Sequence, residues 1–254
     1  MKLRLFTFLF LAPLLLHGQI KPLNFKAGNK LVPLKSDVMA NLKKHDFSNI
    51  WMQTDNSVIF GFIGIKHQRI RVKFLKVAKD NLRPEIYHVS GKSMVKGNVC
   101  DFNGMITIGN IQQYKNTSVG LDGEYKNKVA GEYSLTGTYV FNENKTQSHV
   151  GIFKGVFQSD IYIDKKNGIH YDDLDKVSDS YSNNQFVGTW TSYDHKITKA
   201  CNWGDYRIPN AGQFDTGAGE FNPDTKDASL GWQTYIDMQK SDKAKKEEER
   251  HWWN

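Results

Sequence analysis

The sequence lacks most of the local signatures of enzymes. It contains no Gly-x-Ser-x-Gly elbow, no His-Glu-x-x-His pair, no Walker A loop and no Cys-x-x-Cys, which argues against the commonest serine hydrolases, zinc proteases, nucleotide-binding proteins and thiol oxidoreductases. No motif indicates a cofactor, so none is expected. Paired carboxylates leave no local signature, and a glycan-acting hydrolase therefore stays open. Proline is also missing between Pro84 and Pro209, so no proline interrupts strands there.

Cysteine is scarce as well, because the chain has only Cys100 and Cys201. In an oxidising compartment an even pair indicates one disulfide. Such a bond would close a loop of about 100 residues and stabilise the fold by up to about 4.7 kcal/mol in the chain-entropy model. The alternative is two buried free thiols. A catalytic pair would need His170 or His195 to meet Cys201, and nothing in the sequence brings them together.

The long apolar run of the chain lies at its N-terminus. Lys2 and Arg4 precede the apolar residues 5–16, and Gly18 follows as a small residue. This order is typical of a secretory signal peptide, and the run is shorter than the about 20 residues of a membrane-spanning helix. We expect residues 1–18 to be removed, leaving a secreted or periplasmic protein that does not span a membrane.

The charge of the chain is mildly positive. Lysine and arginine number 34 against 27 acidic residues, and removal of Lys2 and Arg4 with the signal leaves 32 against 27, a net charge of +5. An excess of this size favours weak attraction to anionic surfaces. Because no nucleic-acid-binding module accompanies it, we expect no nucleic-acid partner. The sequence gives no oligomeric state.

Alternating apolar and polar residues predict strands in the middle of the chain. In residues 67–74, Ile70, Val72 and Phe74 alternate with basic residues, which is the pattern of a strand buried on one face. We predict a hairpin over residues 159–172, because Asn167 and Gly168 supply the positive φ of a tight turn.

A glycine followed two residues later by an aromatic recurs in this region. The spacing places both on one face of a strand, where the ring covers the bare glycine backbone. Glycines inside strands mark bends, so we predict a curved antiparallel sheet that closes into a barrel or a sandwich, with Trp190 buried in it and Gly188 allowing close strand approach. The pairs are Gly131/Tyr133, Gly137/Tyr139, Gly151/Phe153, Gly155/Phe157 and Gly188/Trp190.

Two stretches carry resemblances to known families. The segment FVGTWTSY resembles the Gly-x-Trp strand of lipocalin-type and avidin-type barrels, which implies a calycin-like barrel. The run NNQFVGTWTSY followed by CNWGDYRIPNAGQFDTGAGEF is similar to a family of secreted, β-rich bacterial envelope proteins. That second resemblance implies export and a β fold, and it brings no activity or catalytic residues with it.

The composition divides the mature chain into three parts. Residues 19–48 predict an irregular lead-in with one helical turn near 37–44, and residues 49–238 form the β domain. Residues 239–254 are a charged tail that can form a short helix but has no apolar stripe to bury, so we expect it to be solvated. Its final pair, Trp252 and Trp253, is compatible with docking on the barrel or on a partner.

The stretch FDTGA, residues 214–218, has the form of an aspartic protease loop. Those enzymes need two aspartates that share one proton, and too little chain follows Asp215 to complete even the dimeric type of this fold. We therefore expect Asp215 to hold its own loop instead. It would do so by pairing with Arg207 or by accepting hydrogen bonds from the amides of Gly217 and Gly219.

The aperiodic loop 201–223 is the candidate site. A loop this long inside a compact chain is usually functional or disordered. In the binding hypothesis, two aromatic rings offer stacking faces and four charged groups supply polar contacts to a glycan, lipid, peptide or other envelope component; these residues are Trp203 and Tyr206, and Asp205, Arg207, Asp215 and Glu220. In the hydrolase hypothesis, two of Asp205, Asp215 and Glu220 are catalytic. In the structural alternative, the loop plugs the barrel, with Arg207 paired to Asp205 or Asp215 and the tryptophan in the core, and the protein is a purely structural envelope protein.

Two further clusters of polar residues can be explained without a binding site. His170, Asp172, Asp173 and Asp175 offer calcium ligands, but their spacing does not match an EF-hand loop, so no metal is expected. Segment 66–79 is basic and contains no acid. It is suited either to phosphate-bearing envelope polymers or to protecting a sheet edge.

Overall fold

A computed structural model describes residues 33–254 of the chain, so the predicted signal peptide lies outside the described residues. The strands are β1 (Pro33–Asp37), β2 (Ile59–Ile63), β3 (Gln68–Lys79), β4 (Ile86–Val95), β5 (Asn98–Tyr114), β6 (Val129–Glu143), β7 (Gly151–Asp164), β8 (Ile169–Tyr171), β9 (Asn183–Ser192) and β10 (Thr198–Asp205). The α-helices are α1 (Met39–Leu42), α2 (Gln233–Asp237) and α3 (Asp242–Glu249), and the 3-10 helices are η1 (Ser48–Trp51), η2 (Asn56–Val58), η3 (Gly212–Phe214) and η4 (Thr225–Leu230). None of the helices in this part of the chain has the length and apolar character to cross a membrane.

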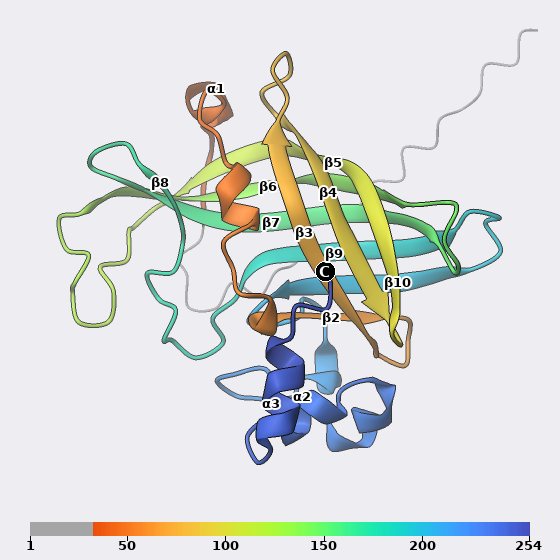
Figure 1. Ribbon diagram of the computed structural model, residues 1–254. Helices are drawn as coiled ribbons and strands as arrows, with labels where there is room; N and C mark the ends of the chain where they lie inside the picture. The colour runs from red at the N-terminus through yellow and green to blue at the C-terminus, as the bar shows by residue number, and fades with distance from the viewer. Residues whose placement is uncertain (1–32) are drawn as a thin grey trace, which may run out of the picture.

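Eight of the strands form a closed ring (Figure 1). They follow one another around it as β2, β3, β4, β5, β6, β7, β9 and β10, and β10 then pairs with β2. Every pairing is antiparallel. This is the up-and-down barrel architecture, so the predicted all-β fold is confirmed, and of the two predicted forms the chain adopts the barrel. β1 pairs with β5 and β8 pairs with β7 beside the ring.

The predicted alternation places apolar side chains inside the barrel. Ile70, Val72 and Phe74 belong to the core, as the pattern in β3 indicates. The predicted hairpin is also present, because β7 pairs with β8 across a turn in which Asn167 has a φ of 65°. β3 lies between β2 and β4, so it is not a sheet edge.

Glycines permit the close packing of aromatic rings in the barrel. Gly155 on β7 lies opposite Gly188 on β9, and a Cβ atom built on them would come within 2.9 Å and 2.6 Å of the Tyr139 hydroxyl, respectively. The ring of Tyr139 on β6 therefore covers two bare backbones at once. This differs from the predicted pairing, because the ring that lies against each of these glycines comes from another strand and not from the aromatic two residues later. Trp190, two residues after Gly188, is buried as expected.

The segment before β2 closes one end of the barrel, which we call the plugged end. Its side chains Phe47, Ile50 and Trp51 join the barrel core. The indole Nε1 of Trp51 donates a hydrogen bond of 2.9 Å to Ser159 Oγ on β7. α1 falls within the segment where a helical turn was expected.

The C-terminal part of the chain packs against the outer face of β2, beneath the barrel in Figure 1. Phe60 and Phe62 point outward from β2 and form a second core with Phe214, Phe221 and Trp232. β2 pairs with β3 at only two positions. The C-terminal part thus stabilises the ring at the place where the hydrogen-bonded ladder between β2 and β3 is short.

The expectation of a solvated charged tail is wrong. Glu248 of α3 is 3 % exposed, and it accepts hydrogen bonds from Arg69 Nη1 at 2.8 Å and from Arg71 Nη2 at 2.9 Å. Burial alone would raise the pKa of Glu248, but the hydrogen bonds and positive charges of the two arginines outweigh it and lower the pKa. Trp252 is also buried, and the ammonium of Lys73 lies 4.9 Å from the centre of the Trp253 ring. The tail therefore docks on the basic outer face of β3.

The predicted disulfide is absent, because Cys100 and Cys201 are both buried free thiols. Cys100 lies on β5 and Cys201 on β10. These strands stand on opposite sides of the ring, separated by β4, β3 and β2 in one direction and by β6, β7 and β9 in the other. A disulfide needs Cα atoms within about 6.8 Å, little more than one strand spacing of about 4.8 Å. Burial, and then the charge of Glu143, raise the pKa of both thiols, which makes them unreactive.

Candidate functional site

The first residues of the predicted binding loop belong to the barrel wall. Trp203 and Asp205 lie on β10 and point into the barrel. The Trp203 ring is 3 % exposed and stacks on Phe186 at a centroid distance of 4.9 Å. It is a core residue, as in the structural alternative, and it presents no stacking face to a ligand in solution.

Asp205 is held inside the plugged end by three donors. Its Oδ2 accepts hydrogen bonds from Thr54 Oγ1 at 2.8 Å, Tyr171 OH at 2.9 Å and Asn184 Nδ2 at 2.8 Å. Burial raises the pKa of Asp205 to about 7, although these hydrogen bonds act in the opposite direction. A cavity of about 20 Å³ lies beside it, which is room for about one water molecule. Asp205 thus ties the plug to the barrel wall.

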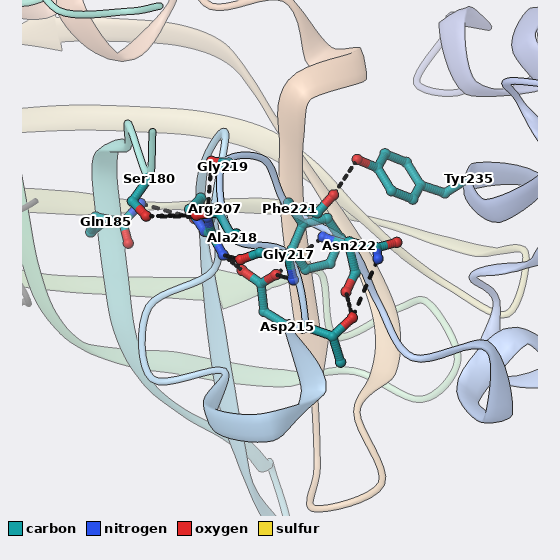
Figure 2. A network of polar contacts seen from close by, with 11 residues as sticks. Ser180, Gln185, Arg207, Asp215, Gly217, Ala218, Gly219, Phe221, Asn222 and Tyr235 are labelled. Carbon is teal, nitrogen blue, oxygen red and sulfur yellow. Dashed lines mark hydrogen bonds and ion pairs between the residues drawn. The ribbon is translucent and has the colours of Figure 1, made fainter. Parts of the chain in front are cut away.

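Arg207 organises the rest of the loop (Figure 2). Its Nε donates to Asp215 Oδ2 at 2.8 Å, its Nη2 donates to the carbonyl of Gly217 at 2.7 Å, and its Nη1 donates to the carbonyl of Gly219 at 3.0 Å. One guanidinium therefore neutralises the carboxylate and satisfies two backbone carbonyls of the loop.

Asp215 completes the same network, so the FDTGA stretch is held as a structural loop. Its Oδ1 accepts hydrogen bonds from the amides of Gly217 and Asn222, both at 3.1 Å. The predicted pairing with Arg207 and the bond from Gly217 are confirmed. Gly219 differs from the prediction, because it offers its carbonyl to Arg207 and no amide bond to Asp215.

The remaining two predicted residues lie at the surface. Tyr206 is half-buried, with a φ of 64°, and its ring packs edge-on against Tyr181 at 5.0 Å. Glu220 is exposed. The three candidate catalytic carboxylates thus have separate surroundings: Asp205 lies inside the barrel, Asp215 is bonded to Arg207, and Glu220 faces solvent.

The opposite end of the barrel is open, and sequence reasoning did not identify it. Four hairpin connections gather there, on the right in Figure 1: β2–β3, β4–β5, β6–β7 and β9–β10. They surround a cavity of about 1540 Å³, which we call the cup. Its floor consists of buried residues from seven strands, namely Ile63, Ile70, Ser93, Cys100, Glu143, Phe153 and Trp190.

Glu143 is the acidic residue on the floor of the cup. Its Oε1 accepts a hydrogen bond from Ser93 Oγ at 2.5 Å, and its Oε2 accepts bonds of 2.8 Å from Trp190 Nε1 and from the amide of Gly151. These groups lie on β4, β9 and β7. Burial raises the pKa of Glu143 and the three hydrogen bonds partly oppose the rise. The carboxyl joins three strands to β6 and fixes the orientation of the Trp190 ring.

A signal for Glu143 was present in the sequence. Leu135, Tyr139 and Phe141 are separated by even numbers of residues, which places them on one face of a strand. Continuing the same period by two residues places Glu143 on that inner face. A carboxylate at an inward position is a departure from the pattern, and such departures mark candidate sites.

The exposed side chains around the cup, which we call the rim, are basic with two apolar tips. Ile65 is 92 % exposed and Ile197 is 49 % exposed. The lysines of the rim are Lys66, Lys96, Lys145, Lys196 and Lys199. Asp194 is the acidic residue among the exposed groups of these connections, and it lies 3.7 Å from Lys196.

Within residues 33–254, no group of three or more histidine, cysteine, aspartate or glutamate side chains is arranged to hold a metal ion. In the acidic cluster after β7, His170 instead bonds to Asp164 at 2.8 Å. Comparisons of the chain with protein-family models, with curated proteins and with solved structures find no match.

Proposed function

We propose that this protein is a non-enzymatic binding protein, secreted or periplasmic, that holds one amphipathic ligand in the cup. The observation that carries the proposal is the unequal filling of the barrel. Eight-stranded barrels either fill with side chains or hold one small ligand. Here aromatic rings fill the middle and the plugged end, while the space over Phe153 and Trp190 is open.

The lining of the cup favours a lipid-like ligand over a glycan. Ile63, Ile70, Phe153 and Trp190 give the floor a mostly apolar surface. Ligand sites typically combine such a surface with a few polar groups that fix orientation. The rim lysines would attract an anionic head group, so the ligand would lie with its apolar part on the floor and its charged end at the rim.

Glu143 supplies one polar contact inside the cup. A carboxylate has about four lone-pair sites, and the wall donors occupy three of them, one on Oε1 and two on Oε2. The remaining site on Oε1 would accept a hydrogen bond from a hydroxyl or amide group of the ligand. This contact would add affinity for chains that carry a donor near their buried end, and a simple amphipath without one would still bind through the apolar floor and the rim.

The alternative of a glycan hydrolase has less support. Such enzymes need two carboxyl groups facing each other across an open cleft, about 5–10 Å apart. Asp205 is enclosed, and Asp215 is bonded to Arg207 and to loop amides. In this proposal the loop 201–223 anchors β10 and the C-terminal part, and it does not itself contact the ligand.

Calorimetric titration with dodecanoate and with dodecanol tests the proposal. Both ligands should bind, and dodecanoate should bind more tightly because of the rim lysines. Val150→Trp, at a half-buried position of the cup lining, should weaken binding at least about tenfold by filling the space. Val119→Trp, at an exposed position near the plugged end, is the matched control and should leave binding unchanged.

The proposal fails if neither ligand binds. It also fails if Val150→Trp and Val119→Trp bind equally well while both unfold at the wild-type temperature.

A further inference from the structure

The two ends of the barrel differ in charge. The four connections of the open end, residues 64–67, 96–97, 144–150 and 193–197, carry four basic residues and one acidic residue. The three connections of the plugged end, residues 80–85, 115–128 and 165–182, carry seven basic and eight acidic residues. The connections around the cup therefore carry a net positive charge, whereas acidic residues slightly outnumber basic ones at the plugged end.

Exposed apolar side chains occur at both ends, so they do not by themselves distinguish a docking surface. Leu82, on the β3–β4 connection of the plugged end, is 91 % exposed, much like Ile65 at the open end. The surroundings differ. Leu82 lies between Asp80 and Arg83, which bond to each other, whereas Ile65 is followed by Lys66 and lies on the rim of the cup.

We infer that the rim docks on the surface of an anionic lipid bilayer, with Ile65 and Ile197 inserted among the head groups and the lysines on the lipid phosphates. Lysines that flank exposed apolar side chains combine the two forces that hold proteins at membrane interfaces. Each basic residue near an anionic leaflet strengthens binding about fivefold. In this orientation the mouth of the cup opens onto the bilayer.

This inference concerns the rim and does not depend on whether the cup holds a ligand. If the proposed function also holds, an amphipath would pass between the bilayer and the cup without crossing water. The barrel would remain outside the hydrocarbon layer, because only hairpin tips would enter the interface.

Vesicle co-sedimentation tests the inference, with residues 19–254 as the chain so that the apolar N-terminal run is not a second membrane-binding element. The wild type should bind vesicles of equal parts phosphatidylcholine and phosphatidylglycerol, and it should not bind vesicles of phosphatidylcholine alone. Replacing Lys66 and Lys96 together by glutamine should weaken binding about 25-fold. The same replacement of Lys165 and Lys166 at the plugged end removes equal charge and should leave binding unchanged.

A second matched pair tests the apolar tips. Ile65→Ser should weaken binding to the mixed vesicles about tenfold, because about 1.5 kcal/mol or more accompanies burial of such a side chain, and Leu82→Ser should leave it unchanged. Equal binding to both kinds of vesicle, no binding by the wild type, or equal losses in the paired variants would overturn the inference. Dodecanoate binding is measured separately in vesicle-free solution, so a failure of the rim is distinguished from a failure of the cup.

Discussion

Replacing Asp205 by asparagine should make the protein less sensitive to pH. The carboxyl is 3 % exposed, and burial raises its pKa from 3.8 to about 7. In the unfolded chain the group ionises at its ordinary value. Between about pH 4 and about pH 7 the folded protein therefore holds a proton that the unfolded chain has released, and its stability falls as the pH rises.

The size of the effect follows from the shift. A difference of about 3 pKa units corresponds to about 4 kcal/mol of the free energy of unfolding, at about 1.36 kcal/mol per unit. The stabilisation is fully present below pH 3.8 and is lost as the pH rises through about 7. Asparagine keeps one oxygen acceptor for Thr54, Tyr171 and Asn184 but does not titrate. The difference in stability between the two proteins should shift by about 4 kcal/mol in favour of Asp205→Asn over this interval.

Urea unfolding of both proteins from about pH 4 to about pH 8 measures this difference. Glu143, whose pKa is raised, and His45 and His67, whose pKa values are lowered, also contribute to the pH dependence. Both proteins share these contributions, so they cancel in the comparison. Parallel stability curves for Asp205→Asn and the wild type would refute the reasoning, because they would show that Asp205 ionises alike in the folded and unfolded states.

Three further substitutions test other parts of the structure. Asp215→Asn should lower the free energy of unfolding by about 3 kcal/mol, because Arg207 is left partly buried without its partner. The substitution should also speed proteolysis of loop 201–223. Acid peptidase activity that the wild type has and a normally stable Asp215→Asn variant lacks would contradict this prediction. Tyr139→Phe should raise stability by up to about 1 kcal/mol, since the buried hydroxyl has no hydrogen-bond partner in the described structure; a clear drop in melting temperature would indicate a hidden partner. Glu248→Gln should lower the free energy of unfolding by about 3 kcal/mol at neutral pH. Because the pKa of Glu248 is lowered in the folded protein, this difference between variant and wild type should vanish as the pH falls through that pKa. An unchanged unfolding curve would show that the tail is not docked through Arg69.

The barrel strands could be predicted because their burial pattern is local. Ile70, Val72 and Phe74 face the interior and their neighbours face outward, so the sequence alternates wherever a strand has one buried face. The turn at Asn167 was visible for the same reason, since a tight hairpin restricts the residues inside it.

Contacts between distant segments could not be predicted in this way. Glu248 is separated from Arg69 by 179 residues, and each lies in a run of charges that is compatible with a solvated surface. Their burial depends on the C-terminal part returning to β3. The absent disulfide has the same origin, because the number of cysteines says nothing about which strands become neighbours in the ring.

The candidate site was the hardest part to predict. The cup is built from four hairpins and from floor residues on seven strands, and no short segment contains more than a few of them. The binding hypothesis was placed on the loop 201–223 because its aromatic, charged and glycine residues lie close together in the sequence. In the structure that concentration serves a tight fold around Arg207.

The order of the strands in the ring has a consequence for synthesis of the protein. Consecutive ring strands can pair as they emerge. The pairing of β2 with β10, in which Cys201 lies opposite Ile63, can form only after β10 has been synthesised. Until then the nascent chain is an open sheet with a free edge at β2, and Phe60 and Phe62 have no partners on their outer face. Unpaired edges of this kind favour association between chains. The interval between the emergence of β2 and the arrival of the last quarter of the sequence is thus when the chain most needs protection from aggregation.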